Sequence, residues 1–286
     1  MIYDCVIVGR GPAGLSAAIY LARAGKKVLV IGGLNKIWNS EVKINNYFGI
    51  GEMTGKALME KGEAQAEGFG AQIIDALVTK VTINDKGVFA CTANSKEYFG
   101  KKLLISTGSA AMKKEIVNQD DFIGRGVSFC VPCDGFFFKD KKVIVVGNSE
   151  YALEEAIELL DYTKDVTIVT NGKKLNFDKK LLDKRIKFEE YAIEKIIGDK
   201  KVKGIKTNKN EIVLDGIFIA SGNADSSDLA RMLGVISENN KIIVDENMKT
   251  NIPGVFAAGD CTPGFGQIAT AVAKGAVAGM AISKEV

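Results

Sequence analysis

The sequence predicts an α/β protein made of two Rossmann-like domains of the three-layer ββα, dinucleotide-binding type, one inserted into the other. Short apolar strands alternate with stretches of helical periodicity along the chain. Glycine is abundant, with 31 residues against four prolines, and many glycines directly follow an apolar β-branched run, where strand-to-helix turns are tight. The length of 286 residues also suits about two domains.

The first strand–turn–helix unit opens the chain. Residues 5–8 form an apolar strand, a Gly-x-Gly-x-x-Gly turn follows, and residues 15–24 repeat small and apolar residues as a packed helix does. In this motif the glycines permit a tight turn, a close approach of the backbone to a pyrophosphate, and close packing of helix on strand. The helix N-terminus then faces the anion. The alternative is a purely structural turn. The predicted dinucleotide-binding residues here are Gly9, Gly11, Pro12, Ala13 and Gly14.

One feature expected of a dinucleotide site is missing. The second strand of the unit, residues 28–31, ends in Gly32-Gly33, with no Asp or Glu to bind a ribose hydroxyl. A dinucleotide can still bind, but its adenosine half must then be held by different contacts.

A second unit of similar design follows. Residues 142–146 form a strand, Gly147 opens a turn, and residues 151–160 form a helix. Near the C-terminus a short strand, a turn and a helix of small residues complete the first domain. We therefore place one domain at 1–110 and 241–286, and the inserted domain at 111–240.

Composition excludes several classes of function. The chain has no His, which excludes zinc–His sites and Ser-His or Cys-His dyads, and we expect no metal. With 38 basic and 35 acidic residues the net charge is only +3, so we expect no nucleic-acid partner. No apolar run approaches the roughly 18–20 residues of a membrane span. A strand begins almost at residue 1, which leaves no signal peptide, so we expect a cytoplasmic protein.

The stretch Cys130-Val131-Pro132-Cys133 is the most informative in the sequence. Two Cys at this spacing can form a reversible disulfide. The alternative is half of a zinc site, which the remaining cysteines and the lack of His do not complete. Asp134, the next residue, is either a proton donor and acceptor for a departing thiolate or a turn-capping carboxylate.

The segment around these cysteines, residues 124–137, resembles the active site of the low-molecular-weight thioredoxin reductases. The segment Thr250-Asn251-Ile252-Pro253-Gly254-Val255-Phe256-Ala257-Ala258-Gly259-Asp260 resembles the same family, as do Gln267-Ile268-Ala269 and Ile44-Asn45-Asn46-Tyr47-Phe48-Gly49. The similarity covers essentially the whole chain in the right order.

The resemblance implies a homodimer that binds FAD in the discontinuous domain and carries the redox disulfide in the inserted domain. It places Cys133 toward the flavin, gives Cys130 the exchange with thioredoxin, and makes Asp134 the acid–base. By position it also implies flavin or ribityl contacts from Asn46, Gly108, Gly259, Asp260, Gln267 and Ile268. The chain departs from the family at Lys36-Ile37-Trp38, so the flavin contacts of that segment cannot be transferred.

The second nucleotide turn lacks the features of an NADPH site. It reads Gly147-Asn148-Ser149-Glu150-Tyr151-Ala152, where the family has Gly-x-Gly-x-x-Ala. Ser149 places a Cβ where the backbone should approach the pyrophosphate, and Glu150 adds negative charge near that anion. The next strand ends without the arginines that bind a 2′-phosphate. We therefore expect no NAD(P)H.

Another electron donor is then needed. Residues 171–209 carry 13 Lys and Arg against six Asp and Glu, which indicates either a solvated basic face or a docking surface for an acidic carrier. The combination resembles the ferredoxin-dependent flavin thioredoxin reductases. It implies electron transfer from reduced ferredoxin through FAD and Cys130–Cys133 to thioredoxin. The alternatives are an NADPH-dependent reductase with an atypical site, a dithiol oxidase using dioxygen, and a non-catalytic flavin-containing thiol sensor.

Overall fold

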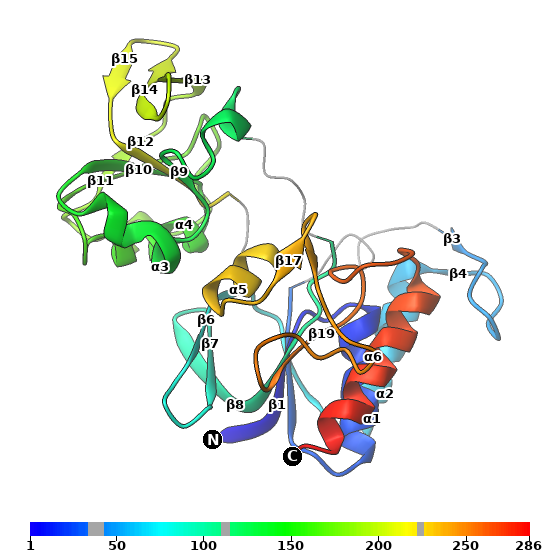
Figure 1. Cartoon of the computed structure of the whole chain (residues 1–286). Helices are drawn as coiled ribbons and strands as arrows, with labels where there is room; N and C mark the ends of the chain where they lie inside the picture. Colours follow the sequence, from blue (N-terminus) through cyan, green and yellow to red (C-terminus); the bar gives the residue numbers. More distant parts are fainter. Residues whose placement is uncertain (34–42, 110–114, 222–225) are drawn as a thin grey trace. The chain divides into compact units, whose positions relative to one another are not determined.

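The computed structural model describes residues 1–33, 43–109, 115–221 and 226–286. The chain divides into two compact units, which we call unit 1 (Met1–Ala110 with Asp225–Val286) and unit 2 (Ala111–Ala224) (Figure 1). Each unit is built on its own mainly parallel sheet. The predicted α/β architecture with two Rossmann-like sheets is therefore confirmed.

The main sheet of unit 1 has the first strand of the chain near its centre. Strand β1 pairs in parallel with β2 on one side and β8 on the other, so the carboxyl ends of the three strands lie at one edge of the sheet, the edge where α/β sheets bind ligands. The strand order is β5 (Gln72–Ile74), β2 (Val28–Ile31), β1 (Ile2–Val8), β8 (Lys96–Ile105), β7 (Phe89–Ala93) and β6 (Val78–Ile83), with β19 (Val255–Ala257) also paired with β8.

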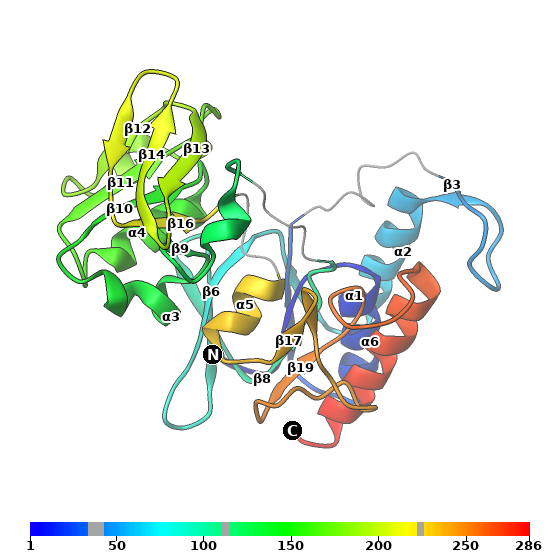
Figure 2. The ribbon, with the colours of Figure 1, turned by 45° about the horizontal axis from the view of Figure 1, so that its top comes forward.

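Three helices lie side by side against this sheet: α1 (Pro12–Arg23), α2 (Gly55–Gly68) and α6 (Ile268–Ser283) (Figures 1 and 2). Helix α1 contacts both of the others. It can approach α6 closely because α6 presents Gly275, where a Cβ would lie only 2.1 Å from the Ala13 carbonyl oxygen. No helix in the described parts of the chain is long and apolar enough to span a bilayer.

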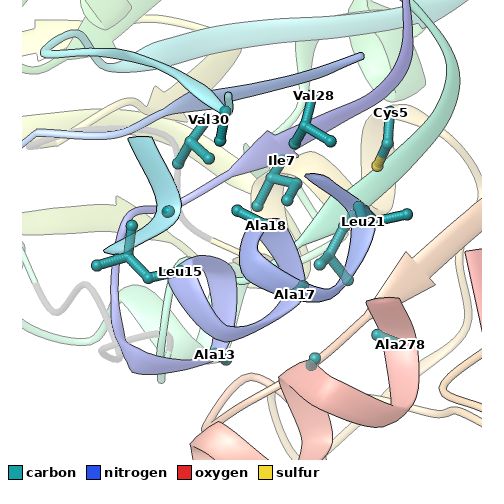
Figure 3. Close-up of a cluster of buried hydrophobic side chains, with 14 of the residues drawn as sticks. Cys5, Ile7, Ala13, Leu15, Ala17, Ala18, Leu21, Val28, Val30 and Ala278 are labelled. Atoms are coloured by element: carbon teal, nitrogen blue, oxygen red, sulfur yellow. The ribbon is translucent and has the colours of Figure 1, made fainter. Parts of the chain in front are cut away.

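The core of unit 1 lies between α1 and the first two strands. Ala18 of α1 lies beside Ile7 of β1, whereas Ala17 lies on the side of α1 that is nearer Ala278 of α6 (Figure 3). The small residues of α1 let the helix pack tightly on the β-branched surface of the sheet. This packing holds the glycine turn between β1 and α1 in a fixed place.

Unit 2 carries a parallel sheet and a separate antiparallel one. The parallel order is β12 (Lys187–Glu189), β11 (Asp165–Val169), β10 (Lys142–Val146), β16 (Gly216–Ile219) and β9 (Val127–Ser128). The antiparallel strands are β13 (Ile193–Gly198), β14 (Val202–Thr207) and β15 (Glu211–Val213). The helical segments are α3 (Val131–Asp134), α4 (Glu150–Leu159) and the 3₁₀ turns η1 (Gln119–Phe122), η2 (Gly135–Phe138) and η3 (Lys179–Leu181).

The return to the first unit comes earlier than the predicted residue 241. The division falls between Ala224 and Asp225, because the following elements pack in unit 1. Ser226 Oγ donates a hydrogen bond to the Gly108 carbonyl at 3.3 Å. The elements that follow this division are α5 (Ser226–Met232) and a hairpin of β17 (Ser237–Glu238) and β18 (Lys241–Ile242). Unit 1 also contains a second hairpin, formed by β3 (Lys43–Ile44) and β4 (Met53–Thr54).

Candidate active site

The glycine turn after β1 shows the close contacts that its motif requires. Gly9 has a φ of +109°, and a Cβ there would lie 2.4 Å from the carbonyl oxygen of Ser106. A Cβ on Gly14 would lie 2.0 Å from the Gly9 carbonyl oxygen. Helix α1 begins at Pro12, and its N-cap is Gly11, so no side chain covers the first N–H groups of the helix. The turn therefore offers these groups to an anion.

The C-terminal part of the chain adds a second turn at the same edge of the sheet. The Ala258 N–H donates to the Ile105 carbonyl at 3.0 Å, which extends the pairing of β19 with β8. Gly259 follows with a φ of +88°, and a Cβ there would lie 2.9 Å from the Ala13 Cβ. The structure thus brings the predicted Gly259-Asp260 turn against the first turn of α1.

Two further predicted residues meet although they are far apart in the sequence. Asn46 Nδ2 donates to Gln267 Oε1 at 3.0 Å. Gln267 is the N-cap of α6, and Ile268 is the first residue of that helix. The loop after β3 is thereby joined to the start of α6. Lys36-Ile37-Trp38 lie outside the described residues.

A buried hydroxyl at the end of β8 indicates a ligand at this edge. Thr107 Oγ1 is buried, with no hydrogen-bond partner among the described residues. The next residue is Gly108, with a φ of +80°. A buried hydroxyl without a partner is costly, and a bound polar group can satisfy it. The helix end, the close glycine contacts and this hydroxyl together fit a dinucleotide such as FAD.

Cys130 and Cys133 are joined by a disulfide, with their Cα atoms 5.4 Å apart. Helix α3 begins directly after Cys130, with Pro132 in its first turn. Cys130 is only 2% exposed, whereas Cys133 is exposed. Cys133 is therefore the more accessible member of the pair.

Asp134 is tied to the disulfide ring through a serine. Ser128 Oγ donates to Asp134 Oδ2 at 2.6 Å and accepts from the Cys130 N–H at 3.1 Å. Ser128 is buried at the end of β9, whereas Asp134 is half-buried. The serine fixes the carboxylate of Asp134 relative to the Cys130 backbone. Sequence reasoning missed Ser128. The only signal in the sequence is that a polar residue stands two positions before Cys130 in an otherwise apolar stretch.

A second carboxylate holds the start of α3. Glu155 of α4 is only 4% exposed, and its Oε2 accepts from the Val131 N–H at 3.1 Å. A buried carboxylate that accepts a backbone N–H at a helix start stabilises that end of the helix. Sequence reasoning missed Glu155 as well, because it looks like any glutamate of an amphipathic helix.

A cavity of roughly 480 Å³ lies beside Asp134 in unit 2, and its wall includes Phe137 and the cations Arg125 and Lys201. The three phenylalanines that follow the disulfide have different environments. Phe138 is buried and packs edge-on against Phe218, with ring centres 5.1 Å apart. Phe136 and Phe137 are 71% and 66% exposed. Phe138 is thus a core residue, whereas Phe136 and Phe137 are not.

In unit 2, the turn after β10 is covered by the segment that follows β11. Asn148 Nδ2 donates to the Lys174 carbonyl at 2.7 Å, and the Asn176 N–H donates to the Asn148 carbonyl at 2.7 Å. Lys173 Nζ forms an ion pair with Glu115 at 2.6 Å. The backbone of Lys174 and Asn176 is therefore bonded to Asn148, in the turn where a coenzyme pyrophosphate would have to bind.

The basic stretch at 171–209 forms an exposed surface. Each of its Lys and Arg residues is exposed. Six of them pair with carboxylates, at distances from 2.6 to 3.8 Å: Lys173, Lys179, Arg185, Lys187, Lys203 and Lys206. Part of the positive charge is thus neutralised by neighbouring carboxylates. Because Lys and Arg outnumber Asp and Glu by 13 to six in this stretch, the surface remains positively charged.

The three other cysteines have the environment of core residues. Cys5, Cys91 and Cys261 are free thiols and are fully buried. Burial raises the pKa of Cys5, and it raises the pKa of Cys91 and Cys261 to about 12. These thiols are therefore protonated and inert near neutral pH, which leaves Cys130 and Cys133 as the reactive pair.

Residues 3–275 match the model of the pyridine nucleotide-disulphide oxidoreductase family. The chain belongs to this family. The thioredoxin reductases of Listeria innocua and Aquifex aeolicus are each 36% identical to it; they cover 100% and 99% of this chain, and the matches span 94% and 93% of the relatives. This family member is a thioredoxin reductase-type flavoprotein oxidoreductase with a Cys130–Cys133 redox disulfide.

Two solved structures resemble this oxidoreductase over nearly its whole length. The atypical thioredoxin reductase TRi from Desulfovibrio vulgaris Hildenborough is 40% identical with a TM-score of 0.95, covering 99% of this chain and 98% of its own. A ferredoxin-flavin thioredoxin reductase from Clostridium acetobutylicum is 31% identical with a TM-score of 0.72, at the same coverage. Both structures belong to proteins described as thioredoxin reductases, and of the two TRi is more similar to this chain than the ferredoxin-flavin enzyme is.

Proposed function

We propose that this flavoprotein reduces thioredoxin with electrons from a reduced ferredoxin, and that it does not use NAD(P)H. The observation that carries this proposal is the covered turn in unit 2. A coenzyme pyrophosphate needs the N–H groups at the start of α4, and in the turn just before that helix Asn148 is already bonded to the backbone of Lys174 and Asn176. Glu150, in the first turn of α4, adds a negative charge that opposes the phosphates.

Opening this site would disrupt several contacts at once. Asn171 Nδ2 donates to the Glu115 carbonyl at 2.9 Å, and its Oδ1 accepts from the Ile193 N–H at 2.7 Å. Asn171 thus holds this segment to Glu115 and to Ile193 through the two polar atoms of its side-chain amide. A nucleotide would have to displace a segment held by hydrogen bonds rather than enter a preformed crevice.

Ferredoxin is the proposed donor for two reasons. The exposed basic surface at 171–209 suits an acidic electron carrier, because complementary charge raises the encounter rate. The structurally similar Clostridium acetobutylicum protein is described as a ferredoxin-flavin thioredoxin reductase. Both observations support an acidic iron–sulfur protein as the partner.

The residues of each unit have separate tasks in the proposed reaction. Unit 1 would hold FAD with the glycine turn, Thr107 and Asp260; bound FAD supplies a redox group that can exchange electrons singly or in pairs. Reduction of Cys130–Cys133 takes up two electrons and two protons and gives a dithiol. Asp134, held by Ser128, is placed to give and take a proton at this pair.

The dithiol then reduces thioredoxin by exchange. The Cys130 thiolate attacks one sulfur of the thioredoxin disulfide and forms a mixed disulfide, and the second thioredoxin sulfur leaves as a thiol. Cys133 then attacks the Cys130 sulfur of the mixed disulfide. This restores the Cys130–Cys133 disulfide and releases the thioredoxin sulfur that Cys130 had attacked, so that both thioredoxin cysteines are now thiols. Because Cys130 is 2% exposed, this assignment requires a movement that uncovers it before the exchange.

The roles of the two cysteines are tested by single substitutions. We expect Cys130→Ser to abolish the mixed disulfide with thioredoxin while Cys133 still perturbs the flavin absorption spectrum. We expect Cys133→Ser to trap the mixed disulfide on Cys130. The reverse pattern, which the greater exposure of Cys133 would suit, contradicts the assignment.

The donor is tested by anaerobic flavin spectroscopy of the purified holoprotein. NADPH, NADH and reduced ferredoxin freed of excess dithionite are added in turn while the absorbance of the oxidised flavin is followed. We expect bleaching with ferredoxin and none with stoichiometric NADPH or NADH within minutes. Rapid bleaching by NADPH would refute the proposal and identify an NADPH-dependent reductase. Peroxide formation coupled to dithiol consumption would identify a dithiol oxidase instead.

A further inference from the structure

We propose that Asp75, at the end of β5, binds the adenosine ribose hydroxyls of the bound dinucleotide in place of the carboxylate that β2 lacks. The proposal rests on the FAD site of unit 1 described above. It also explains how a glycine motif without its usual acidic partner can hold a dinucleotide.

The end of β2 has no room for the usual acidic side chain. A Cβ on Gly32 would lie 2.5 Å from the Arg10 backbone nitrogen and 3.2 Å from the Arg10 Cβ. Contacts this short with backbone cannot be relieved by a side-chain rotation. The residue that follows Gly9 in the turn therefore occupies the space into which a residue-32 side chain would extend.

Asp75 provides a carboxylate next to that position from the neighbouring strand. Strands β2 and β5 are parallel, and the Gly32 N–H donates to the Ile74 carbonyl at 3.1 Å, so Asp75 follows directly at the shared edge. Asp75 Oδ1 lies 4.0 Å from the point where a Cβ of Gly33 would be. The carboxylate thus lies within one side-chain length of the place where the motif normally has its acid.

Arg10 orients this carboxylate. Arg10 Nη2 lies 3.5 Å from Asp75 Oδ2, and Arg10 Nη1 donates to Glu63 Oε1 at 3.2 Å. The Arg10 side chain is only 7% exposed, whereas Asp75 is 62% exposed. The guanidinium is therefore a buried support, with Glu63 as its second partner. Asp75 is the member of the cluster that a ligand can reach.

The chemistry of the cluster favours a ribose diol. A carboxylate accepts hydrogen bonds from the two vicinal hydroxyls of ribose, and such charge-assisted bonds are the stronger kind. Two carboxylates beside each other would also repel a 2′-phosphate. The ligand that this cluster fits is the unphosphorylated adenosine half of a dinucleotide.

The test combines a substitution with a ligand change in the holoprotein. The dissociation constant of FAD is measured from the fluorescence of released flavin on dilution, and FAD analogues with 2′-deoxy- or 3′-deoxyadenosine are exchanged into the same protein. We expect Asp75→Asn to weaken FAD binding about 10-fold or more. We expect the wild type to disfavour at least one deoxy analogue by a similar factor, and Asp75→Asn to lose that preference.

Asp85→Asn is the matched control, because Asp85 is an exposed aspartate of the same unit in the β6–β7 turn. It should leave FAD affinity and the analogue preference unchanged. Unchanged FAD binding by Asp75→Asn, or its full retention of the preference, would overturn the proposal. Should Asp75→Asn not fold, a wild type that binds both deoxy analogues as tightly as FAD would overturn it equally. A wild type that bound no FAD would instead refute the flavin site itself.

Discussion

Ser128 connects the two chemical groups that the proposed reaction needs in unit 2. Its hydroxyl donates to Asp134 and accepts from the Cys130 backbone, so a single side chain sets the distance between the carboxylate and the redox ring. Glu155 supports the same ring from α4 through the Val131 N–H. A proton donor is effective only when its position is fixed, which makes these supporting contacts part of the chemistry.

The first prediction concerns this serine. Ser128→Ala removes the 2.6 Å bond to Asp134. We expect the rate of thioredoxin reduction by the pre-reduced protein to fall about 10-fold, with the FAD content unchanged, because Asp134 is no longer held near the ring. Stopped-flow measurement of thioredoxin reduction checks this, with the exposed Ser237→Ala as control. An unchanged rate would show that Ser128 has no role in positioning Asp134.

Local residue patterns were sufficient for part of the site. The glycine turn and the Cys pair could be predicted, because their spacing itself carries the chemistry. Asp75, Ser128 and Glu155 could not, because their roles depend on partners that only the folded chain brings near. Asp75 in particular follows β5, more than 40 residues after Gly32 at the end of β2 in the sequence. Only the parallel pairing of these two strands brings the two positions together.

At the scale of elements, the packing of α1 on α6 positions the glycine turn. Gly275 and Gly279 of α6 face α1, and Cβ atoms there would lie 2.1 and 2.8 Å from the Ala13 and Ala17 carbonyl oxygens. The two helices therefore approach backbone to backbone. Because Ala13 lies in the first turn of α1, a shift of α6 would move the N–H groups that face the dinucleotide.

The second prediction follows from this contact. Gly275→Ala should destabilise unit 1 by roughly 2 kcal/mol or more, since backbone atoms of α1 must move to admit the new methyl group. Gly62→Ala in α2 is the control. Its Cβ would meet only Leu15 Cδ1 at 3.4 Å, so we expect a neutral or slightly stabilising effect. Denaturant unfolding followed by flavin fluorescence measures both, and equal stability of the two variants would contradict the prediction.

The third prediction concerns pH. Glu285, after α6, pairs with Lys102 of β8 at 2.6 Å and with Lys249 at 2.7 Å, and hydrogen bonds from these lysines lower the pKa of Glu285 below its ordinary 4.5. The unfolded chain then binds the proton more tightly. The contribution of the two ion pairs to the free energy of unfolding is full above pH 4.5. It is lost as the pH falls through the lowered pKa of Glu285.

Glu285→Gln should therefore cost about 1 kcal/mol at pH 7. The difference from the wild type should shrink as the pH falls below 4.5. Urea unfolding at several pH values measures this, with the exposed Glu246→Gln as control. A difference that is constant with pH would show that charge is not its cause.

Elements with strong apolar periodicity could be predicted, and weakly patterned ones could not. The strands at 28–31 and 142–146 lie where the sequence places them, and the helix of small residues expected near the C-terminus is α6. Helix α2 could not be found, because it is largely polar and contains an internal glycine, Gly62. The unit boundary was missed because the short strands β17 and β18 gave no pattern, and only their packing in unit 1 shows where they belong.

At the scale of the whole molecule, positive charge is concentrated in one stretch of the chain rather than spread evenly along it. The excess of Lys and Arg at 171–209 lies in unit 2, while the net charge of the chain is only +3. A partner with negative charge is therefore attracted to one part of the molecule. This attraction depends on ionic strength, whereas binding of FAD in unit 1 depends mainly on close contacts.

The fourth prediction tests this surface. The double variant Lys180→Glu and Lys184→Glu should lower kcat/KM for ferredoxin about 10-fold at low salt, and the difference should narrow as the ionic strength rises. Both lysines are exposed. The double variant Lys61→Glu and Lys86→Glu, which changes two exposed lysines of unit 1 and the net charge by the same amount, is the control. Equal effects of the two changes would show that only the overall charge matters.

The burial of Cys5, Cys91 and Cys261 has a practical consequence for following the enzyme at work. Alkylating reagents added to the native protein should not react with these three thiols. They should modify only the thiols that form when the Cys130–Cys133 disulfide is reduced. Mass increments on intact protein sampled during turnover would then read out the fraction of molecules carrying open thiols. The unmodified enzyme thus contains its own redox reporter, with no engineered label needed.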